Sequence, residues 1–166
     1  MKEQMEEIAR GALGLKTPPP APAAPKHATT MAKAHVKTAP PEPPSLVDEK
    51  FRVFELAYGS GATMVLSAHT DGPPAQQKFI TLIAQPDLYG NVLVLFKNVT
   101  DNAHLDDAPR MRLIDAVDAL ADNRGELLFE LRGATQRQFA LFRVLRGSAE
   151  KIFVTGGGEY GTPASE

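Results

Sequence analysis

The feature that most constrains the fold is a run of prolines in the first third of the chain. Nine of the 14 prolines fall between Thr17 and Ser45, where alanine, threonine and lysine fill most of the gaps. Each proline fixes its own φ angle and biases the preceding residue toward extended geometry. With so few large apolar side chains, the segment cannot bury enough surface to offset the entropy of ordering it. We therefore predict a disordered, semi-stiff arm over residues 1–48 and a β-rich domain over 49–156.

The two ends of the chain are predicted to differ from the folded part. Met5, Ile8 and Leu13 make a thin apolar stripe near the N-terminus, which predicts a short helix at the tip of the arm. Isolated helices of this length are marginal in water, so we expect it to fray or to become ordered only against a partner. The last residues, 157–166, are predicted to form a flexible tail.

Composition and charge narrow the class of protein. The chain has 166 residues, a hydrophobic fraction of 43% and a formal net charge of −2. Domains that grip phosphate backbones usually carry a basic excess, so nucleic acid is an unfavoured partner. The chain has no cysteine, which excludes disulfides, thiolate metal sites and cysteine nucleophiles. It has no apolar stretch long enough to span a bilayer and no signal peptide as written, so we expect a soluble protein, or an exported or periplasmic one if the true start lies upstream.

Short apolar runs, rich in Val, Ile, Leu and Phe, recur from residue 47 onward and are separated by turn residues such as Gly59-Ser60-Gly61. Such runs at short, regular spacing are typical of an antiparallel sandwich, barrel or propeller-blade-like unit. The predicted strands cover residues 52–58, 63–69, 78–84, 92–97, 126–132, 138–145 and 151–155. The predicted fold class is therefore mostly β.

One segment between the fourth and fifth of these strands allows two interpretations. Leu113, Val117 and Leu120 lie at helical spacing, which predicts a helix near 104–123 and an α+β fold. The alternative is a strand over 111–117, followed by a loop that leads into the next strand. Periodicity slightly favours the helix, whereas the acidic motif at the end of the segment favours strand, loop and strand.

This acidic motif has a carboxylate at every fourth position, namely Asp118, Asp122 and Glu126. Calcium prefers several hard oxygen ligands on a tightly turned loop. With its flanking apolar runs, the segment resembles the calcium-binding loops of integrin-type FG-GAP and VCBS repeats, which join two strands of a β-propeller blade. Leu120 stands where those repeats have a second acid and Asn123 where they have the turn glycine, although asparagine tolerates the left-handed conformation.

The resemblance implies a blade-like unit with a protein or carbohydrate ligand. The sequence otherwise predicts no cofactor; calcium, held by the three carboxylates, is the one that the resemblance allows. Two other interpretations stay open: the loop keeps its shape without metal, or the carboxylates form the solvated face of a helix.

Histidines next to acids form two further candidate sites. His69 and Asp71 follow a predicted strand, and this His-x-Asp arrangement resembles the first ligand motif of co-catalytic zinc exopeptidases, which implies a small metal-dependent hydrolase. His104 and Asp106 lie in an acidic turn, where a histidine among carboxylates can serve as a ligand set. Ordinary polar turn chemistry accounts for both groups as well.

Four arginines lie in or beside the last long predicted hairpin: Arg132, Arg137, Arg143 and Arg146. A basic β face with interleaved aromatic side chains can bind single-stranded nucleic acid. Such arginines more often pair with acids on neighbouring strands, here Glu126 and Glu130. The function that the sequence favours is a non-enzymatic binding or assembly module on a tether, with exposed β edges as a route to self-association.

Overall fold

The computed structural model describes residues 1–15, 45–156 and 158–159. The predicted disordered arm between residues 16 and 44 and most of the predicted tail lie outside these ranges. The described elements are α1 (Lys2–Ala12), β1 (Leu46–Glu55), β2 (Ala62–Thr70), the 3₁₀ turn η1 (Pro74–Gln76), β3 (Lys78–Pro86), β4 (Val92–Asp101), β5 (Arg110–Val117), β6 (Glu126–Arg132), β7 (Gln136–Leu145), β8 (Ser148–Val154) and β9 (Gly158–Glu159).

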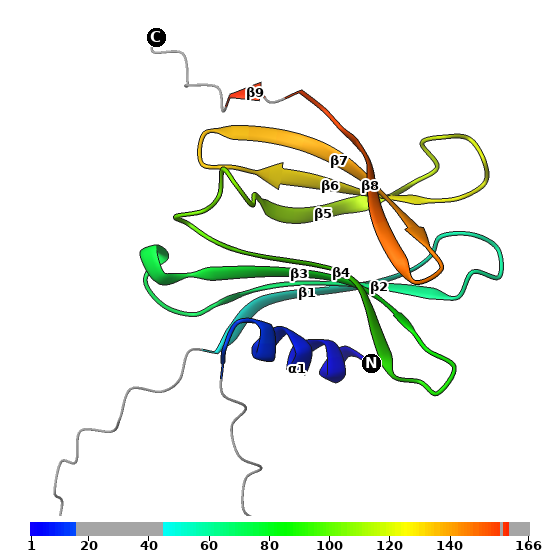
Figure 1. Cartoon of the computed structure of the whole chain (residues 1–166), viewed down its shortest axis with the longest axis horizontal. Helices are drawn as coiled ribbons and strands as arrows, with labels where there is room; N and C mark the ends of the chain where they lie inside the picture. Colours follow the sequence, from blue (N-terminus) through cyan, green and yellow to red (C-terminus); the bar gives the residue numbers. More distant parts are fainter. Residues whose placement is uncertain (16–44, 157, 160–166) are drawn as a thin grey trace, which may run out of the picture.

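The strands form two antiparallel sheets that pack face to face (Figure 1). Sheet 1 has the order β1-β2-β3-β4 and sheet 2 the order β5-β6-β7-β8, with the short β9 added beside β7. Neighbours in the sheet are neighbours in the chain, so each sheet is a meander whose strands are joined by short turns or loops. The prediction of a mostly β fold is confirmed, and the two packed sheets make it a sandwich.

The core between the sheets comes from alternate residues on both of them. Sheet 2 contributes Leu127, Phe129 and Phe142, and sheet 1 contributes Val65 and Ile83, all of them buried. Phe142 lies edge-on to Phe129, with ring centroids 5.4 Å apart. This alternation follows from the pleat of a strand, which sends successive side chains to opposite faces.

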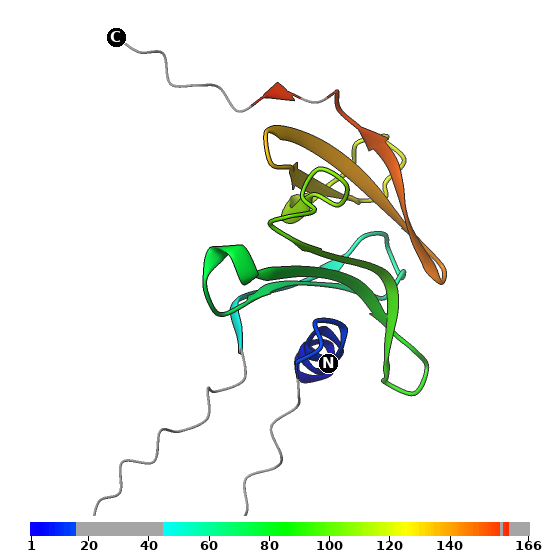
Figure 2. The ribbon, with the colours of Figure 1, turned by 60° about the vertical axis from the view of Figure 1, so that its left-hand side comes forward.

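Helix α1 covers the other face of sheet 1 (Figures 1 and 2). Its buried Met5 and Ala9, with Leu13 directly after the helix, pack on a second apolar cluster that includes Leu66 and Leu82. Because sheet 1 is covered on both faces, β3 is buried at every position from Phe79 to Ala84. The helix that the sequence marked as marginal therefore has a partner within the chain, which is the outer face of sheet 1.

Two boundaries differ from the prediction. Strand β1 spans Leu46–Glu55, where the sequence predicted a strand over 52–58 in a domain that begins at 49, and α1 packs on the domain rather than ending a free arm. No helix among the described residues is long and apolar enough to cross a membrane.

The alternative of a helix near 104–123 is wrong. Strand β5 occupies Arg110–Val117 and pairs with β6, so that Met111 faces Leu131 and Leu113 faces Phe129. A helix would have needed Leu120 on the core face, but this side chain is 54% exposed in the loop that follows. The segment forms a strand because the two-residue period from Met111 to Leu113 fits the pleat of a sheet, and both side chains pack in the core.

Candidate functional site

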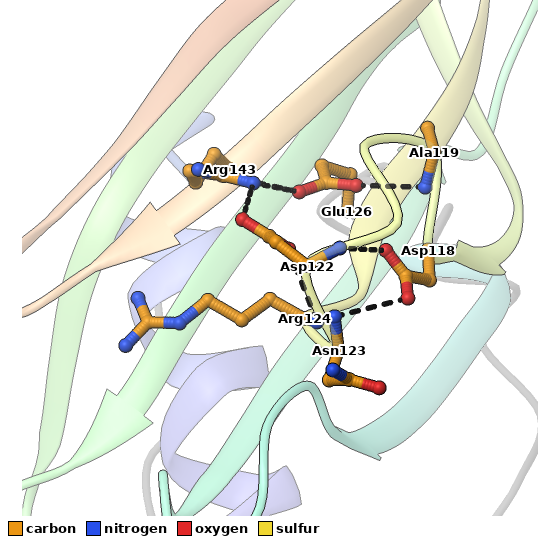
Figure 3. A network of polar contacts seen from close by, with 7 residues as sticks. All are labelled: Asp118, Ala119, Asp122, Asn123, Arg124, Glu126 and Arg143. Carbon is orange, nitrogen blue, oxygen red and sulfur yellow. Dashed lines mark hydrogen bonds and ion pairs between the residues drawn. The ribbon is translucent and has the colours of Figure 1, made fainter.

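The predicted calcium loop is closed by its own backbone (Figure 3). The Asp118 carboxylate accepts hydrogen bonds from the backbone N–H groups of Asp122 and Asn123, each at 3.1 Å. Asn123 has a φ of 60°, so it adopts the left-handed conformation that a glycine would otherwise supply. The turn of the loop is thus held by hydrogen bonds from its own backbone to the Asp118 carboxylate.

The other two carboxylates of this loop face an arginine (Figure 3). Glu126 is fully buried at the start of β6, and its Oε1 accepts from Arg143 Nη2 at 2.6 Å and Nε at 3.1 Å. Its Oε2 accepts from the backbone N–H of Ala119 at 3.0 Å, which joins the beginning of the loop to the start of β6. Arg143 Nη2 also donates to Asp122 Oδ2 at 2.7 Å. The hydrogen bonds that Arg143 donates to Glu126, and then to Asp122, raise the pKa of its guanidinium.

The positive charge that contacts Asp122 and Glu126 is therefore the guanidinium of Arg143, which reaches the loop from β7. In the described ranges no group of three or more His, Asp or Glu side chains is arranged to hold a metal ion. The predicted calcium site at Asp118, Asp122 and Glu126 remains a prediction, for which binding must compete with an ion pair already in place.

The two histidine groups lie apart and differ in their surroundings. His104 is largely exposed, and its Nδ1 lies 2.6 Å from Asp101, a hydrogen bond that lowers the pKa of the Asp101 carboxyl. Asp106 instead accepts from the backbone N–H of Ala134 at 3.1 Å. Asp71 accepts from the N–H of Gly72 in the turn after β2, so it acts within its own turn.

His69, at the end of β2, lines a cavity of about 100 Å³ between the sheets. Its Nδ1 lies 3.0 Å from the carbonyl oxygen of Thr70, and its ring lies 5.7 Å from that of Phe79. The hydroxyl groups of Ser67 and Thr81 also line this cavity and lie 3.2 Å apart. The cavity has room for several water molecules, and hence for a group of the size of a phosphate or carboxylate.

The cavity is strongly basic. Its only acidic lining residue is Asp48, whereas five of its lining side chains are cations: Lys50, Arg52, Arg110, Arg112 and Arg132. We call these five residues the basic cluster. Most of them have partners, because Lys50 lies 3.4 Å from Asp48 and Arg52 lies 3.0 Å from Asp115.

Arg112 and Arg132 of the basic cluster share one buried carboxylate. Glu130, whose side chain is 1% exposed, accepts from Arg112 Nε at 2.6 Å and lies 3.1 Å from Arg132 Nη2. Arg137, outside the cavity, lies 3.6 Å from the other oxygen of Glu130. Burial acts to raise the pKa of Glu130, but the hydrogen bonds and charges of Arg132 and Arg112 outweigh it and the pKa is lowered.

Arg110 forms no ion pair with a carboxylate of the described residues. Its guanidinium carbon lies 4.3 Å from the centre of the Phe79 ring, a cation–π contact that holds it over sheet 1. Burial, and then the neighbouring charge of Arg132, lowers the pKa of Arg110. The buried Nε of Arg132 likewise has no acceptor in the part of the chain that the structure describes. Among the described residues, the carboxylates of Asp48, Asp115 and Glu130 thus face the five cations of the basic cluster, an excess of two positive charges beside the cavity.

The four predicted nucleic-acid residues do not form one surface. Arg132 and Arg137 surround Glu130, Arg143 binds Glu126, and Arg146 lies in the turn between β7 and β8. The expected cross-strand pairing is confirmed for Arg143 with Glu126 and for Arg137 with Glu130, whereas Arg132 and Glu130 lie on the same strand, β6. Arg143 and Arg146 also line a more open cleft of about 430 Å³ at the opposite ends of β2 and β3.

Most members of the basic cluster were missed from the sequence. A signal was present, because Lys50 and Arg52, and likewise Arg110 and Arg112, alternate along their strands and so share one face.

Comparison with known protein families, with curated proteins and with solved structures gives no match.

Proposed function

We propose that this protein is a non-enzymatic binding module that takes a small anionic group, a phosphate or carboxylate, into the cavity between its sheets. The observation that carries the proposal is the unbalanced basic cluster. Arg110 and Arg132 present like charges to each other beside the cavity; Arg110 forms no ion pair among the described residues, and Arg132 shares the carboxylate of Glu130 with Arg112. An anion between them relieves this repulsion and gives Arg132 Nε an acceptor.

The chemistry of the lining fits such a ligand. Guanidinium groups recognise phosphate and carboxylate in a bidentate manner, and a partly buried setting strengthens the interaction. Arg110 is pre-positioned by its contact with Phe79, which reduces the entropy lost on binding. The hydroxyl groups of Ser67 and Thr81 supply neutral hydrogen-bonding groups to the same space.

A hydrolase built on His69 and Asp71 is a weaker proposal. A divalent cation at His69 would lie among five positive side chains, which disfavours it electrostatically. Single-stranded nucleic-acid binding by the hairpin arginines is weaker too, because Arg137 and Arg143 are held by Glu130 and Glu126.

A thermal-shift series tests the proposal. Phosphate, sulfate, acetate and chloride are compared at one ionic strength, so that general screening is constant. Phosphate or sulfate is expected to raise the melting temperature of the wild type, and Arg110→Gln is expected to abolish the rise. Equal melting temperatures in all four salts would refute the assignment.

A further inference from the structure

Three connections of the fold lie at the same end of the sandwich, namely the β1–β2 loop, the β5–β6 loop and the β7–β8 turn (Figure 1). Residues of all three line the cleft of about 430 Å³, which we call the loop cleft. It shares no lining residue with the cavity between the sheets, whose volume is about 100 Å³. Pockets for small organic ligands have volumes of about 300–1,000 Å³, so the loop cleft has room for far more than a bare anion.

The walls of the loop cleft are held by backbone contacts. The N–H of Gly125 donates to the carbonyl oxygen of Leu56, which joins the β5–β6 loop to the β1–β2 loop. A Cβ atom at position 125 would lie 3.3 Å from Leu56 Cδ2, so glycine is the residue that lets the two loops approach this closely. The β1–β2 loop is closed by hydrogen bonds from Ser60 N–H to the Ala57 carbonyl at 2.9 Å and from Ala57 N–H to Ser60 Oγ at 3.1 Å. The chain itself therefore sets the shape of the cleft.

The charged side chains that line the loop cleft are all arginines: Arg124, Arg143 and Arg146. Arg143 is held by the carboxylates of Asp122 and Glu126, neither of which lines the cleft (Figure 3). Arg124 and Arg146 are exposed and form no ion pair with a carboxylate of the described residues. A ligand in the cleft thus meets two cations without a partner in the described part of the chain.

The rest of the lining suits an organic body attached to an anion. Gln85 Nε2 donates to the buried Thr63 Oγ1 at 3.1 Å, and the amide oxygen of Gln85 accepts no hydrogen bond from the described residues. Val144 and Leu145 supply apolar surface to the same cleft. Tyr58 also lines it, and its side chain is fully exposed, so its ring is open to stacking on a flat ligand.

We propose that the loop cleft binds a phosphomonoester of a ring-bearing compound, which is a nucleotide or a sugar phosphate. A phosphomonoester carries a charge of about −1.5 to −2 at pH 7, which matches Arg124 and Arg146, whereas a carboxylate carries a single charge. Guanidinium groups bind phosphate in a bidentate manner. The ring occupies the remaining volume against Gln85 and Tyr58. This site is separate from the cavity between the sheets and does not depend on the function proposed for that cavity.

Isothermal titration of the full chain tests the site. It is carried out in the Arg110→Gln background, so that the cavity between the sheets contributes no anion binding; if the assignment of that cavity fails, the titration still reports on the cleft. AMP and glucose 6-phosphate are the probes. At least one of them is expected to bind at one per chain, and the tighter of the two identifies the organic body. Arg124→Gln combined with Arg146→Gln should weaken this binding on the order of tenfold or more.

Three controls make the result specific. Adenosine, glucose and inorganic phosphate each lack one half of the ligand and should bind more weakly. Lys97→Gln removes an exposed cation of β4 outside both sites and should leave the affinity unchanged. Backbone amide chemical shifts should change at Ser60, Gly125 and Arg146. No binding of either phosphomonoester, equal binding of the control compounds, full affinity in the double arginine variant, or shift changes confined to the cavity between the sheets would each overturn the proposal.

Discussion

The ion pair of Arg143 with Glu126 offers the sharpest test of how the β5–β6 loop is held. Glu126→Ala removes a fully buried carboxylate that binds Arg143 and the N–H of Ala119. Breaking a buried pair costs about 3–5 kcal/mol, and we expect the lower end, about 3 kcal/mol, because Asp122 still contacts Arg143. For a domain of this size the loss corresponds to a fall in melting temperature of about 12 °C.

Urea unfolding followed by circular dichroism measures this loss as a change in midpoint at constant slope. Glu150→Ala is the matched control, because Glu150 is an exposed acid that lies opposite Arg143 on β8, and its loss should change stability by about 0.5 kcal/mol at most. The double variant Glu126→Leu with Arg143→Met removes both charges and should recover about 2 kcal/mol of the loss. A loss below about 1 kcal/mol in Glu126→Ala would refute the reasoning.

Three further results are expected. Glu130 has a lowered pKa in the folded protein, so its contribution to stability is complete above its unfolded pKa of about 4.3 and is lost as the pH falls through the folded pKa. Glu130→Gln should therefore make the free energy of unfolding depend less on pH in this range. An unchanged pH dependence would count against the ion pairs of Glu130 with Arg112 and Arg132. Met5→Glu places a charge in the interface of α1 with sheet 1, so hydrogen exchange should show the α1 amides unprotected while β2 and β3 stay protected. Millimolar calcium should leave the melting temperature unchanged because Arg143 already faces the loop carboxylates, whereas a rise that Asp118→Ala abolishes would establish the calcium site.

The strands of this fold could be predicted because the residues that form the turns between them are adjacent in the sequence. Glycine in positive-φ positions, such as Gly59 and Gly90, ends one apolar run and begins the next. The segment over 111–117 could not be assigned in this way, because its apolar residues satisfy both a helical and a two-residue period. Its partner β6 decides, and that information is not local.

The packing of α1 and the basic cavity between the sheets depend on residues far apart in the chain. Met5 packs in a cluster with Leu66 and Leu82, from which it is separated in the chain by the long proline-rich segment. The ion pair that Arg52 makes with Asp115 joins residues 63 positions apart. The strand bounds alone therefore do not show which basic side chains meet, although their alternation shows which ones share a face.

Isothermal titration of the full chain with inorganic phosphate tests the central claim most directly. The wild type should bind one phosphate per chain, Arg110→Gln should lose this binding, and Arg146→Gln, in the β7–β8 turn away from the cavity, should retain it. Loss of one guanidinium partner from a charged hydrogen-bonded site costs about 2–5 kcal/mol, which weakens binding by about 30-fold or more. Phosphate binding that Arg110→Gln leaves unchanged, or no binding by the wild type, would contradict the assignment of the cavity.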